Sequence, residues 1–442
     1  MEVIIIKVVQ FFAALSLLVL IHEFGHFIAA RIFGIRVEKF YIFFNPWFSI
    51  WKRKIGDTEY GIGWLPLGGY VSIAGMIDES IDQEQLERMK QDPQPWEFRT
   101  KPAWQRLIVM LAGVTMNVLL AMVIYSAMLY AWGDSYYHND DMVHGYAFNE
   151  EGHRLGFEDG DRIVAIDGET IGDVTTIGQM LLLADGERKV DIIRRGEAQT
   201  LTLSLESLVA MRESGGYKGL YREFIPYVVN TVESESAKAS GITEGDRIIA
   251  INGTATPYFR ADSELLTSAR GTTASVDVVR GVDTLALAVP ISDEGLMGIT
   301  VRQTLPRHND YGFWASIPAG AKRGVEEIKS YWEQVKLIFN PETKLYKEVG
   351  GFIAIGNIFP GEWNWMAFWN LTALLSIMLA VMNLLPIPGL DGGHALFTLW
   401  EIITRRKPSD KFLEVMQYIG LGLLLLLLVY ANGSDIVKLF IK

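Results

Sequence analysis

Apolar residues along this chain gather into four stretches that are long enough to cross a membrane. A transmembrane helix needs about 20 mainly apolar residues to cross a hydrocarbon layer of ~30 Å. The predicted spans are residues 3–30, 107–132, 366–385 and 412–430. The first has no basic leader before its apolar run and no A-x-A cleavage site, so we expect a retained span rather than a cleaved signal peptide.

The long polar segment between the second and third spans contains an internal repeat. The run GFEDGDRIVAIDG at residues 156–168 returns as GITEGDRIIAING at residues 241–253, with eight of thirteen positions identical. Each copy has a Gly-Asp turn, a buried strand, an Asx-Gly turn, a polar helix-like stretch and then an alternating strand. The distance between the two copies predicts two small α+β domains in tandem.

The segment after the repeats, residues 311–339, is too charged to span a membrane but carries apolar side chains at steps of three and four. This spacing predicts an amphipathic helix, broken near Pro318, at the outer membrane interface. A helix packed on the second repeat is the alternative.

The predicted fold class is a polytopic α-helical membrane protein with four transmembrane helices and two α+β domains in its large loop. The predicted divisions are an N-terminal membrane segment (1–132), two repeat domains (133–222 and 223–305), an amphipathic interfacial segment (306–365) and a C-terminal membrane segment (366–442).

Composition and charge narrow the possible functions. Half of the residues are hydrophobic, 21% are charged and the net charge is −12, which excludes a disordered chain and argues against a nucleic-acid partner. The absence of cysteine excludes disulfides, cysteine zinc sites and thiol catalysis.

Basic residues cluster after span one, before span two and between spans three and four, so we expect those loops in the cytoplasm and both termini outside it.

The end of the first span carries the sequence His22-Glu23-Phe24-Gly25-His26, which matches H-E-x-x-H. On a helix, two histidines four residues apart project from one face and can chelate one zinc ion. Glu23 can then reach a zinc-activated water, take its proton and later deliver it to a leaving amine. Such polar residues are costly near a bilayer, so we interpret them as functional.

A third metal ligand is expected near the end of the third span. Asp391 is the only carboxylate between Glu362 and Glu401. Prolines and glycines around it break the helix, which membranes tolerate only where the backbone is buried or lines a cavity. We favour Asp391 as the ligand over His394, which we assign to supporting Asp391. A helix cap is the alternative role for Asp391.

Three features together resemble the site-2 protease family of intramembrane metalloproteases: H-E-F-G-H in span one, N-x-x-P-x-P-x-L-D-G-G from residue 383 to residue 393, and the repeats between spans two and three. The repeats themselves are similar to PDZ domains, although neither copy has a clear Gly-Leu-Gly-Phe loop for binding a terminal carboxylate. The resemblance implies that His22, His26 and Asp391 bind one Zn²⁺ and that Glu23 is the base.

The resemblance also implies how substrate is held. It implies that Asn383 lies near the scissile peptide, and that Gly68, Gly69 and Tyr70 begin a membrane-inserted β-hairpin whose edge strand pairs with substrate. An ordinary interfacial hairpin is the alternative. The chain has Asn45-Pro46 where relatives often carry a G-x-G turn. In span two, A-G-x-x-x-N ends at Asn117, to which we assign a structural role.

The sequence therefore predicts an intramembrane zinc endopeptidase in the bacterial inner membrane. The resemblance implies that its substrates are pre-trimmed single-pass membrane proteins, as in regulated proteolysis of an anti-sigma factor, or signal-peptide remnants. The PDZ-like domains, outside the cytoplasm, would filter substrates by size or bind peptides. A cation transporter would usually need two related membrane halves, which the spans lack. The alternative is a non-catalytic peptide sensor, against which the intact Glu23 argues.

Overall fold

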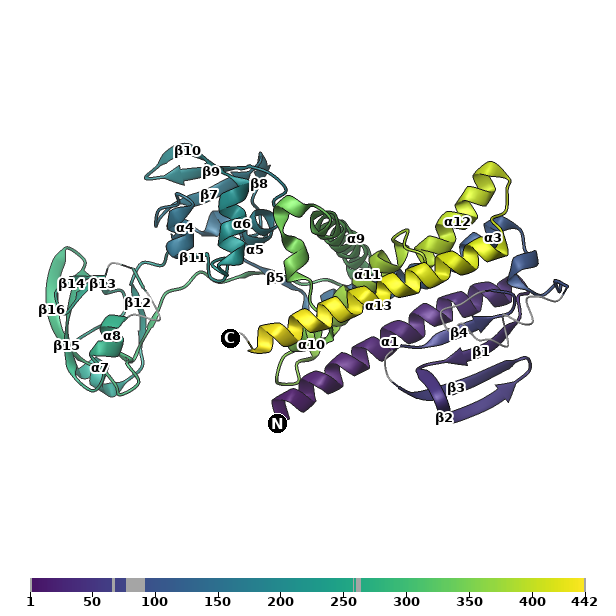
Figure 1. The fold of residues 1–442 in the computed structure, drawn as a ribbon. Helices are drawn as coiled ribbons and strands as arrows, with labels where there is room; N and C mark the ends of the chain where they lie inside the picture. Colours follow the sequence, from purple (N-terminus) through teal and green to yellow (C-terminus); the bar gives the residue numbers. More distant parts are fainter. Residues whose placement is uncertain (1, 66–67, 77–91, 257, 260–263, 441–442) are drawn as a thin grey trace. The chain divides into compact units, whose positions relative to one another are not determined.

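The computed structural model describes residues 2–65, 68–76, 92–256, 258–259 and 264–440. The chain forms two compact units (Figure 1). The membrane unit comprises Met1–Asp134, Asp310–Pro341 and Leu345–Lys442, and the repeat unit comprises Ser135–Asn309 and Glu342–Lys344. The finer division of the chain into five segments stays a prediction.

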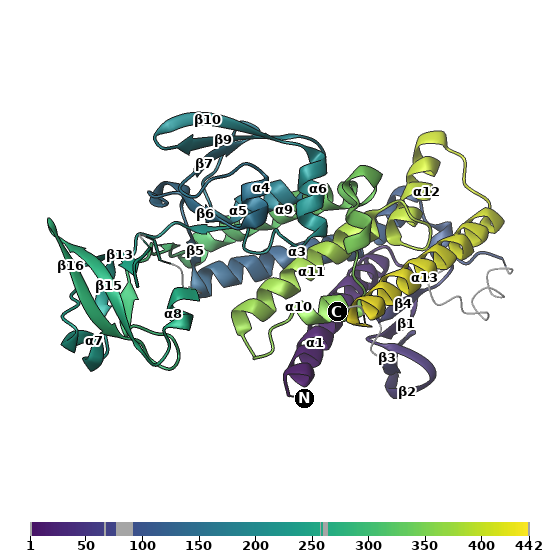
Figure 2. The same cartoon turned by 60° about the vertical axis from the view of Figure 1, so that its left-hand side comes forward.

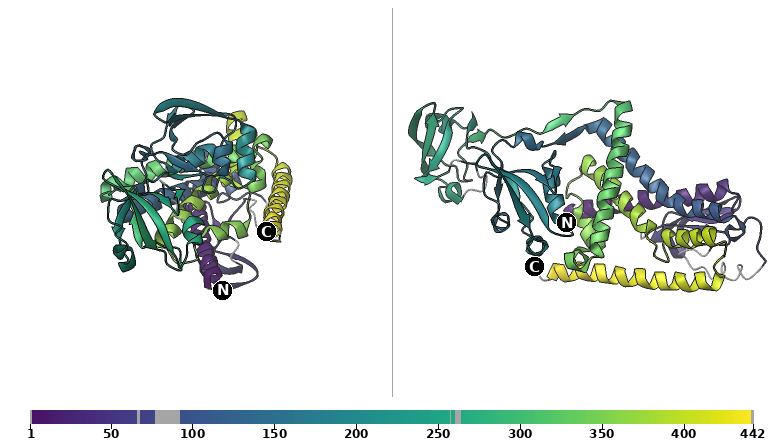
Figure 3. Two further views of the ribbon diagram at one scale, coloured as in Figure 1. Left: turned by 90° about the vertical axis from the view of Figure 1, so that its left-hand side faces the viewer. Right: turned by 90° about the horizontal axis from the view of Figure 1, so that it is seen from above.

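Within the described residues, four helices are long and apolar enough to cross a membrane, as the hydropathy pattern predicts. They are α1 (Glu2–Ile32), α3 (Ala103–Trp132), α11 (Trp365–Leu384) and α13 (Asp410–Phe440). The last of them, yellow in Figure 3, is a single uninterrupted helix. Their orientation across the membrane stays a prediction.

Helix α3 is the centre of the membrane unit and packs against α1, α11, α9 (Phe313–Ile338) and α12 (Asp391–Thr404). The approach to α1 is very close at Gly25, where a methyl group would lie 2.5 Å from the Ala112 carbonyl oxygen. Small residues allow such close helix packing in membranes, where lipid tails compete with apolar side chains.

The predicted break of the amphipathic helix is wrong, because α9 continues through Pro318. Pro318 stands in the second turn and removes only one backbone donor there. The helix is held on α3 in the membrane unit, where Gly320 lies against Ser126 and Gly324 against Met122. The alternative of a helix packed on the second repeat is therefore wrong as well.

A four-stranded sheet follows α1, with the strand order β2-β3-β1-β4. Its strands are β1 (Val37–Tyr41), β2 (Phe44–Ile55), β3 (Thr58–Leu65) and β4 (Tyr70–Ile73). Strands β2 and β3 form an antiparallel hairpin, β3 pairs in parallel with β1, and β4 pairs antiparallel with β1. The segment predicted to form a hairpin at residue 68 is thus a single edge strand, β4, of a larger sheet. Its partner is not the next strand in the chain but β1, which precedes the β2–β3 hairpin.

The two sequence repeats, teal and green in Figure 2, each contain a four-stranded sheet, and the two sheets have the same strand order. The first is β10-β9-β7-β8 and the second is β16-β15-β13-β14. The strands of the first are β7 (Arg162–Ile166), β8 (Glu169–Thr170), β9 (Arg188–Arg194) and β10 (Glu197–Leu203). Those of the second are β13 (Arg247–Ile251), β14 (Thr254–Ala255), β15 (Thr273–Arg280) and β16 (Asp283–Pro290).

The same ion pair closes each repeat. Arg194 donates to both carboxylate oxygens of Asp161 at 2.8 and 2.7 Å, and Arg280 donates to those of Asp246 at 2.7 Å each. The aspartates are the Gly-Asp turn residues of the repeated run, and both are buried. A buried carboxylate is costly unless it is paired, and the same arginine partner at the same place in both copies shows that they share this pairing as well as their strand order. The likeness to PDZ domains stays a prediction.

Shorter elements complete the chain. Between α3 and α9 these are β5 (Asp134–Tyr136), β6 (Tyr146–Phe148), α4 (Glu150–Arg154), α5 (Thr175–Leu182), α6 (Leu205–Glu213), β11 (Tyr221–Glu223), β12 (Val229–Val232), α7 (Glu235–Ala239), α8 (Glu264–Ser268), β17 (Ile299–Val301) and β18 (Arg307–Asn309). Helix α10 (Phe352–Ile358) precedes α11.

Candidate metal centre

Two histidines near the end of α1 form the first half of the centre. His22 and His26 are buried, and their Nε2 atoms lie 3.3 Å apart. The four-residue spacing on one helix accounts for this, because such residues are neighbours on the same face. The rings meet edge to face, with centroids 4.9 Å apart.

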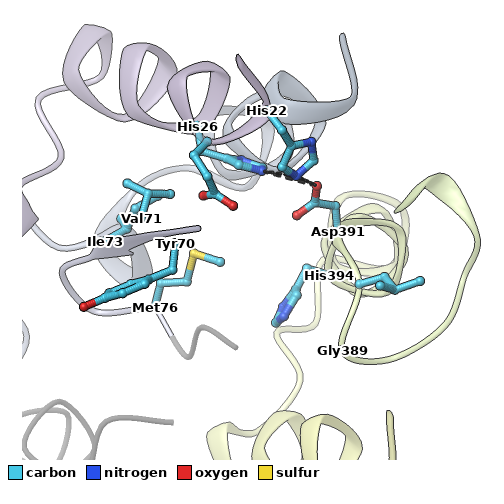
Figure 4. A pocket seen from close by; sticks show the side chains of 11 residues that line it. His22, His26, Tyr70, Val71, Ile73, Met76, Gly389, Asp391 and His394 are labelled. Atoms are coloured by element: carbon cyan, nitrogen blue, oxygen red, sulfur yellow. Dashed lines mark hydrogen bonds and ion pairs between the residues drawn. The ribbon is translucent and has the colours of Figure 1, made fainter. Parts of the chain in front are cut away.

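Asp391 supplies the second half from a distant region of the chain. Helix α11 ends at Leu384, and Asp391 is the first residue of α12 after a turn in which Gly389 has φ +93°. Its Oδ2 atom lies 3.2 Å from Nε2 of His22 and 3.2 Å from Nε2 of His26 (Figure 4). The N-cap of α12 is Leu390, so Asp391 is not the helix cap that was the alternative role.

These three atoms suit a tetrahedral metal ion. Ligands about 2.0–2.1 Å from zinc at tetrahedral angles lie roughly 3.3 Å from one another. The three separations are 3.2, 3.2 and 3.3 Å, and the donors are two imidazole nitrogens and one carboxylate oxygen. Zinc with three protein ligands keeps a fourth position for water or substrate, so this donor set fits a catalytic zinc.

Helix α3 supports both imidazoles from one stripe of residues four apart. Nδ1 of His26 lies 2.8 Å from the Val109 carbonyl oxygen, and Nδ1 of His22 lies 3.3 Å from the Asn117 amide. Gly113, midway between them, faces both rings, and a methyl group there would lie 2.7 Å from Cε1 of His22. Hydrogen bonds to the second ring nitrogen orient metal-binding imidazoles.

A pocket opens beside the three candidate ligands. Glu23 and His394 line it together with them, and Tyr70, Val71, Ile73 and Met76 line it from the sheet region (Figure 4). Within the described residues, the group close enough to share one ion is His22, His26 and Asp391, without His394. This geometry agrees with the choice of Asp391 over His394 as the third member of the group.

Two of the residues predicted to hold substrate lie at the candidate centre, since Tyr70 lines the pocket and Asn383 lies beside His22. The Asn383 side-chain amide is 3.3 Å from Nε2 of His22. Gly69 passes so close to β1 that a methyl group there would lie 2.6 Å from the Tyr41 carbonyl oxygen, and Gly68 has φ +146°. Both glycines thus let β4 start where Tyr70 faces the pocket.

Two supporting contacts were not predicted from the sequence. The Tyr70 hydroxyl donates to Oδ1 of Asn45 at 2.9 Å, so Asn45, which lies within strand β2 and not in a turn, anchors the edge strand. Gly113 and Asn117 contact the histidines, whereas the sequence suggested only a structural role for Asn117. The spacing of polar and glycine positions along an apolar helix was the available signal.

Comparison with known proteins agrees with this geometry. Residues 10–427 match peptidase family M50. The chain belongs to this family. It is 28% identical to the regulator of sigma E protease of Haemophilus influenzae, over 97% of this chain and 98% of that protein.

Other relatives in the family bear names that contain the words zinc metalloprotease. One from Vibrio cholerae is 28% identical over 98% of both chains, and one from Xylella fastidiosa is 29% identical over 95% of this chain and 96% of that protein. The family is that of the site-2 proteases, which use zinc. The chain is therefore a zinc metalloprotease with membrane-spanning helices, as the motifs predict.

Proposed function

We propose that the protein is an intramembrane endopeptidase in which His22, His26 and Asp391 hold one zinc ion. The observation that carries this proposal is the triangle of three ligand atoms with sides of 3.2, 3.2 and 3.3 Å. Both histidines stand on α1, a helix long and apolar enough to span a membrane. Bound zinc lowers the pKa of a water in its open position to about 7 and polarises a carbonyl group.

Glu23 is the general base of the proposed reaction. It lines the pocket next to both histidines and precedes His26 by three residues on the same helix. It takes the proton of the attacking water and delivers it to the leaving amine of the cleaved peptide. His394 stays near Asp391 on α12 and supports it.

Substrate binds as an extended strand along β4. A peptide bond inside a helix is hidden from a nucleophile, so a transmembrane segment must unwind before cleavage. Strand β4 is at the edge of its sheet and its residues line the pocket, and an edge strand can accept another strand through backbone hydrogen bonds. Gly68 and Gly69 lead into this strand, which begins at Tyr70, and Asn383, whose amide lies beside His22, holds the substrate at the centre.

The substrates are single-pass membrane segments in the bacterial inner membrane. Basic loops favour both termini and the repeat unit outside the cytoplasm. The name of the Haemophilus relative supports regulated proteolysis, and removal of signal-peptide remnants is a second use of the same chemistry. The repeats, as PDZ-like domains, act as a size filter that admits trimmed substrates, and the lipid bilayer is the enzyme's other partner.

Replacing Glu23 by Gln tests the mechanism. In purified full-length protein incubated with a labelled single-pass membrane peptide, Glu23→Gln should lower cleavage by about 10²–10⁴-fold, the usual contribution of a general base. Zinc content should stay at one per chain. Glu2→Gln, at the other end of the same helix, is the matched control and should cleave normally. Full cleavage by Glu23→Gln would refute the mechanism, and no cleavage by any form would favour the peptide sensor.

A further inference from the structure

Asn117 is a completely buried polar residue in the middle of α3. Its backbone carbonyl accepts a hydrogen bond from the Ser376 hydroxyl at 2.8 Å, which ties α3 to α11. Its side-chain nitrogen lies 3.3 Å from Nδ1 of His22. Its side-chain oxygen has no hydrogen-bond partner among the residues that the structure describes. A buried polar atom without a partner is costly, so its presence here calls for a physical reason.

The chemistry of His22 supplies that reason. A neutral imidazole carries one proton, and only the other nitrogen offers a lone pair to a metal. Nε2 of His22 faces His26, Asp391 and the Asn383 amide, so the proton must be on Nδ1 when Nε2 binds an ion. Nδ1–H is then a donor that faces the Asn117 amide.

The Asn117 amide can serve both forms of this ring. With its nitrogen toward Nδ1, it donates to a bare nitrogen, which leaves the proton on Nε2 and in reach of Asp391. If the amide flips so that its oxygen and nitrogen exchange places, it keeps its shape and presents Oδ1, which accepts from Nδ1–H. The second arrangement gives the unpartnered oxygen a donor and frees the Nε2 lone pair.

His26 offers an internal comparison. Its Nδ1 lies 2.8 Å from the carbonyl oxygen of Val109, which can only accept. That contact therefore holds His26 with the proton on Nδ1 and the lone pair on Nε2. For His22, the corresponding partner on the same stripe of α3 is a side chain, which a substitution can change.

We propose that Asn117 is a positioning residue that accepts the Nδ1 proton of His22 in a hydrogen bond and thereby holds Nε2 ready for zinc. This inference rests on the proposed binding of zinc by His22. The residue acts through His22 and contacts neither the substrate nor the reacting atoms. Partners of this kind typically change metal affinity by about 10–100-fold.

Zinc affinity of purified full-length variants tests this role. The affinity is measured by competition with a chromophoric chelator. Asn117→Leu has a similar shape but no acceptor, and it should weaken zinc binding about 10–100-fold. Asn117→Asp keeps an acceptor for Nδ1–H and should stay within a few-fold of the wild type. Ser376→Ala removes the bond to the Asn117 backbone, and it should leave zinc affinity unchanged.

Thermal unfolding of the zinc-free proteins separates positioning from packing. If Asn117→Leu does not fold, Asn117→Ala takes its place with the same expected loss of affinity. Wild-type zinc affinity in a folded variant that lacks the acceptor would overturn the inference, and so would failure of Asn117→Asp to retain zinc. The double variant His22→Ala and Asp391→Ala tests the ligands independently: if it keeps one zinc per chain, the proposed site is wrong, whatever Asn117 does.

Discussion

A single methyl group added at Gly113 should disable the metal centre. The Cβ atom of an alanine there would lie 2.7 Å from Cε1 and 2.9 Å from Nδ1 of His22, and it would lie closer still to Nε2 of His26. Ordinary contact begins at 3.4 Å, so the His22 ring must retreat by about 0.7 Å. The rings of His22 and His26 are both buried on one face of α1, so neither ring can move without displacing its Nε2 atom from the other two ligand atoms.

The size of the effect follows from that displacement. A misplacement of about 1 Å at a catalytic centre can cost roughly 100-fold in rate, and overpacking a buried site costs about 1–3 kcal/mol of stability. We expect Gly113→Ala to lower kcat by about 10–100-fold and to weaken zinc binding. Alanine normally stabilises a helix relative to glycine by about 1 kcal/mol, so intrinsic helix propensity works against the predicted loss.

The assay measures cleavage of a labelled single-pass membrane peptide and zinc content in the same preparations. Gly422→Ala is the matched control, because a methyl group at this position in α13 meets nothing within 4 Å. The control should cleave at the wild-type rate and unfold at the same temperature or higher. Gly113→Ala with normal kcat and normal zinc affinity would refute the close packing of α3 on the histidines.

Two further predictions concern the edge strand and the second repeat. A methyl group at Gly69 would lie 2.6 Å from the Tyr41 carbonyl oxygen, so Gly69→Ala should displace β4 from β1. We expect cleavage to fall about tenfold or more while zinc content stays the same. Loss of zinc would show that the fall has a different cause. For Asp246, burial alone would raise the pKa, but hydrogen bonds from Arg280 and Thr243 and the charge of Arg280 outweigh burial and hold the pKa of that carboxyl below its usual range. The unfolded chain therefore takes up this proton first, so the pair stabilises the repeat above about pH 4 and the benefit is lost as pH falls through the lowered pKa. Hydrogen-exchange protection of β15 should fall across that acid range in the wild type. Arg280→Gln should lower protection at neutral pH and reduce the acid dependence; equal pH profiles would contradict this account.

Local signals in the sequence predicted the features of the fold that depend on near neighbours. The four spans follow from apolar length, and His22 and His26 share a face because a helix turns once in about 3.6 residues. The two repeats follow from matching turns, and their ion pairs recur at the same places. The carboxylate of Asp391 was found by its isolation in an apolar region.

Contacts between distant segments escaped the same reasoning. The predicted break in α9 did not occur, because packing of Gly320 and Gly324 on α3 outweighs one lost hydrogen bond at Pro318. The short helix α12 and the pairing of β4 with β1 were not predicted either. Each depends on which partner the segment meets, and periodicity within a segment does not contain that information.

By itself, then, the sequence determined the kinds of groups present: two imidazoles one helical turn apart, a glutamate beside them and a lone carboxylate after a helix break. Only the tertiary structure decided that this carboxylate, near the other end of the chain, lies 3.2 Å from both imidazoles. It also decided that α3 faces them with Val109, Gly113 and Asn117. The physical reason is that helix geometry depends on hydrogen bonds four residues apart, whereas a metal site depends on how separate helices pack.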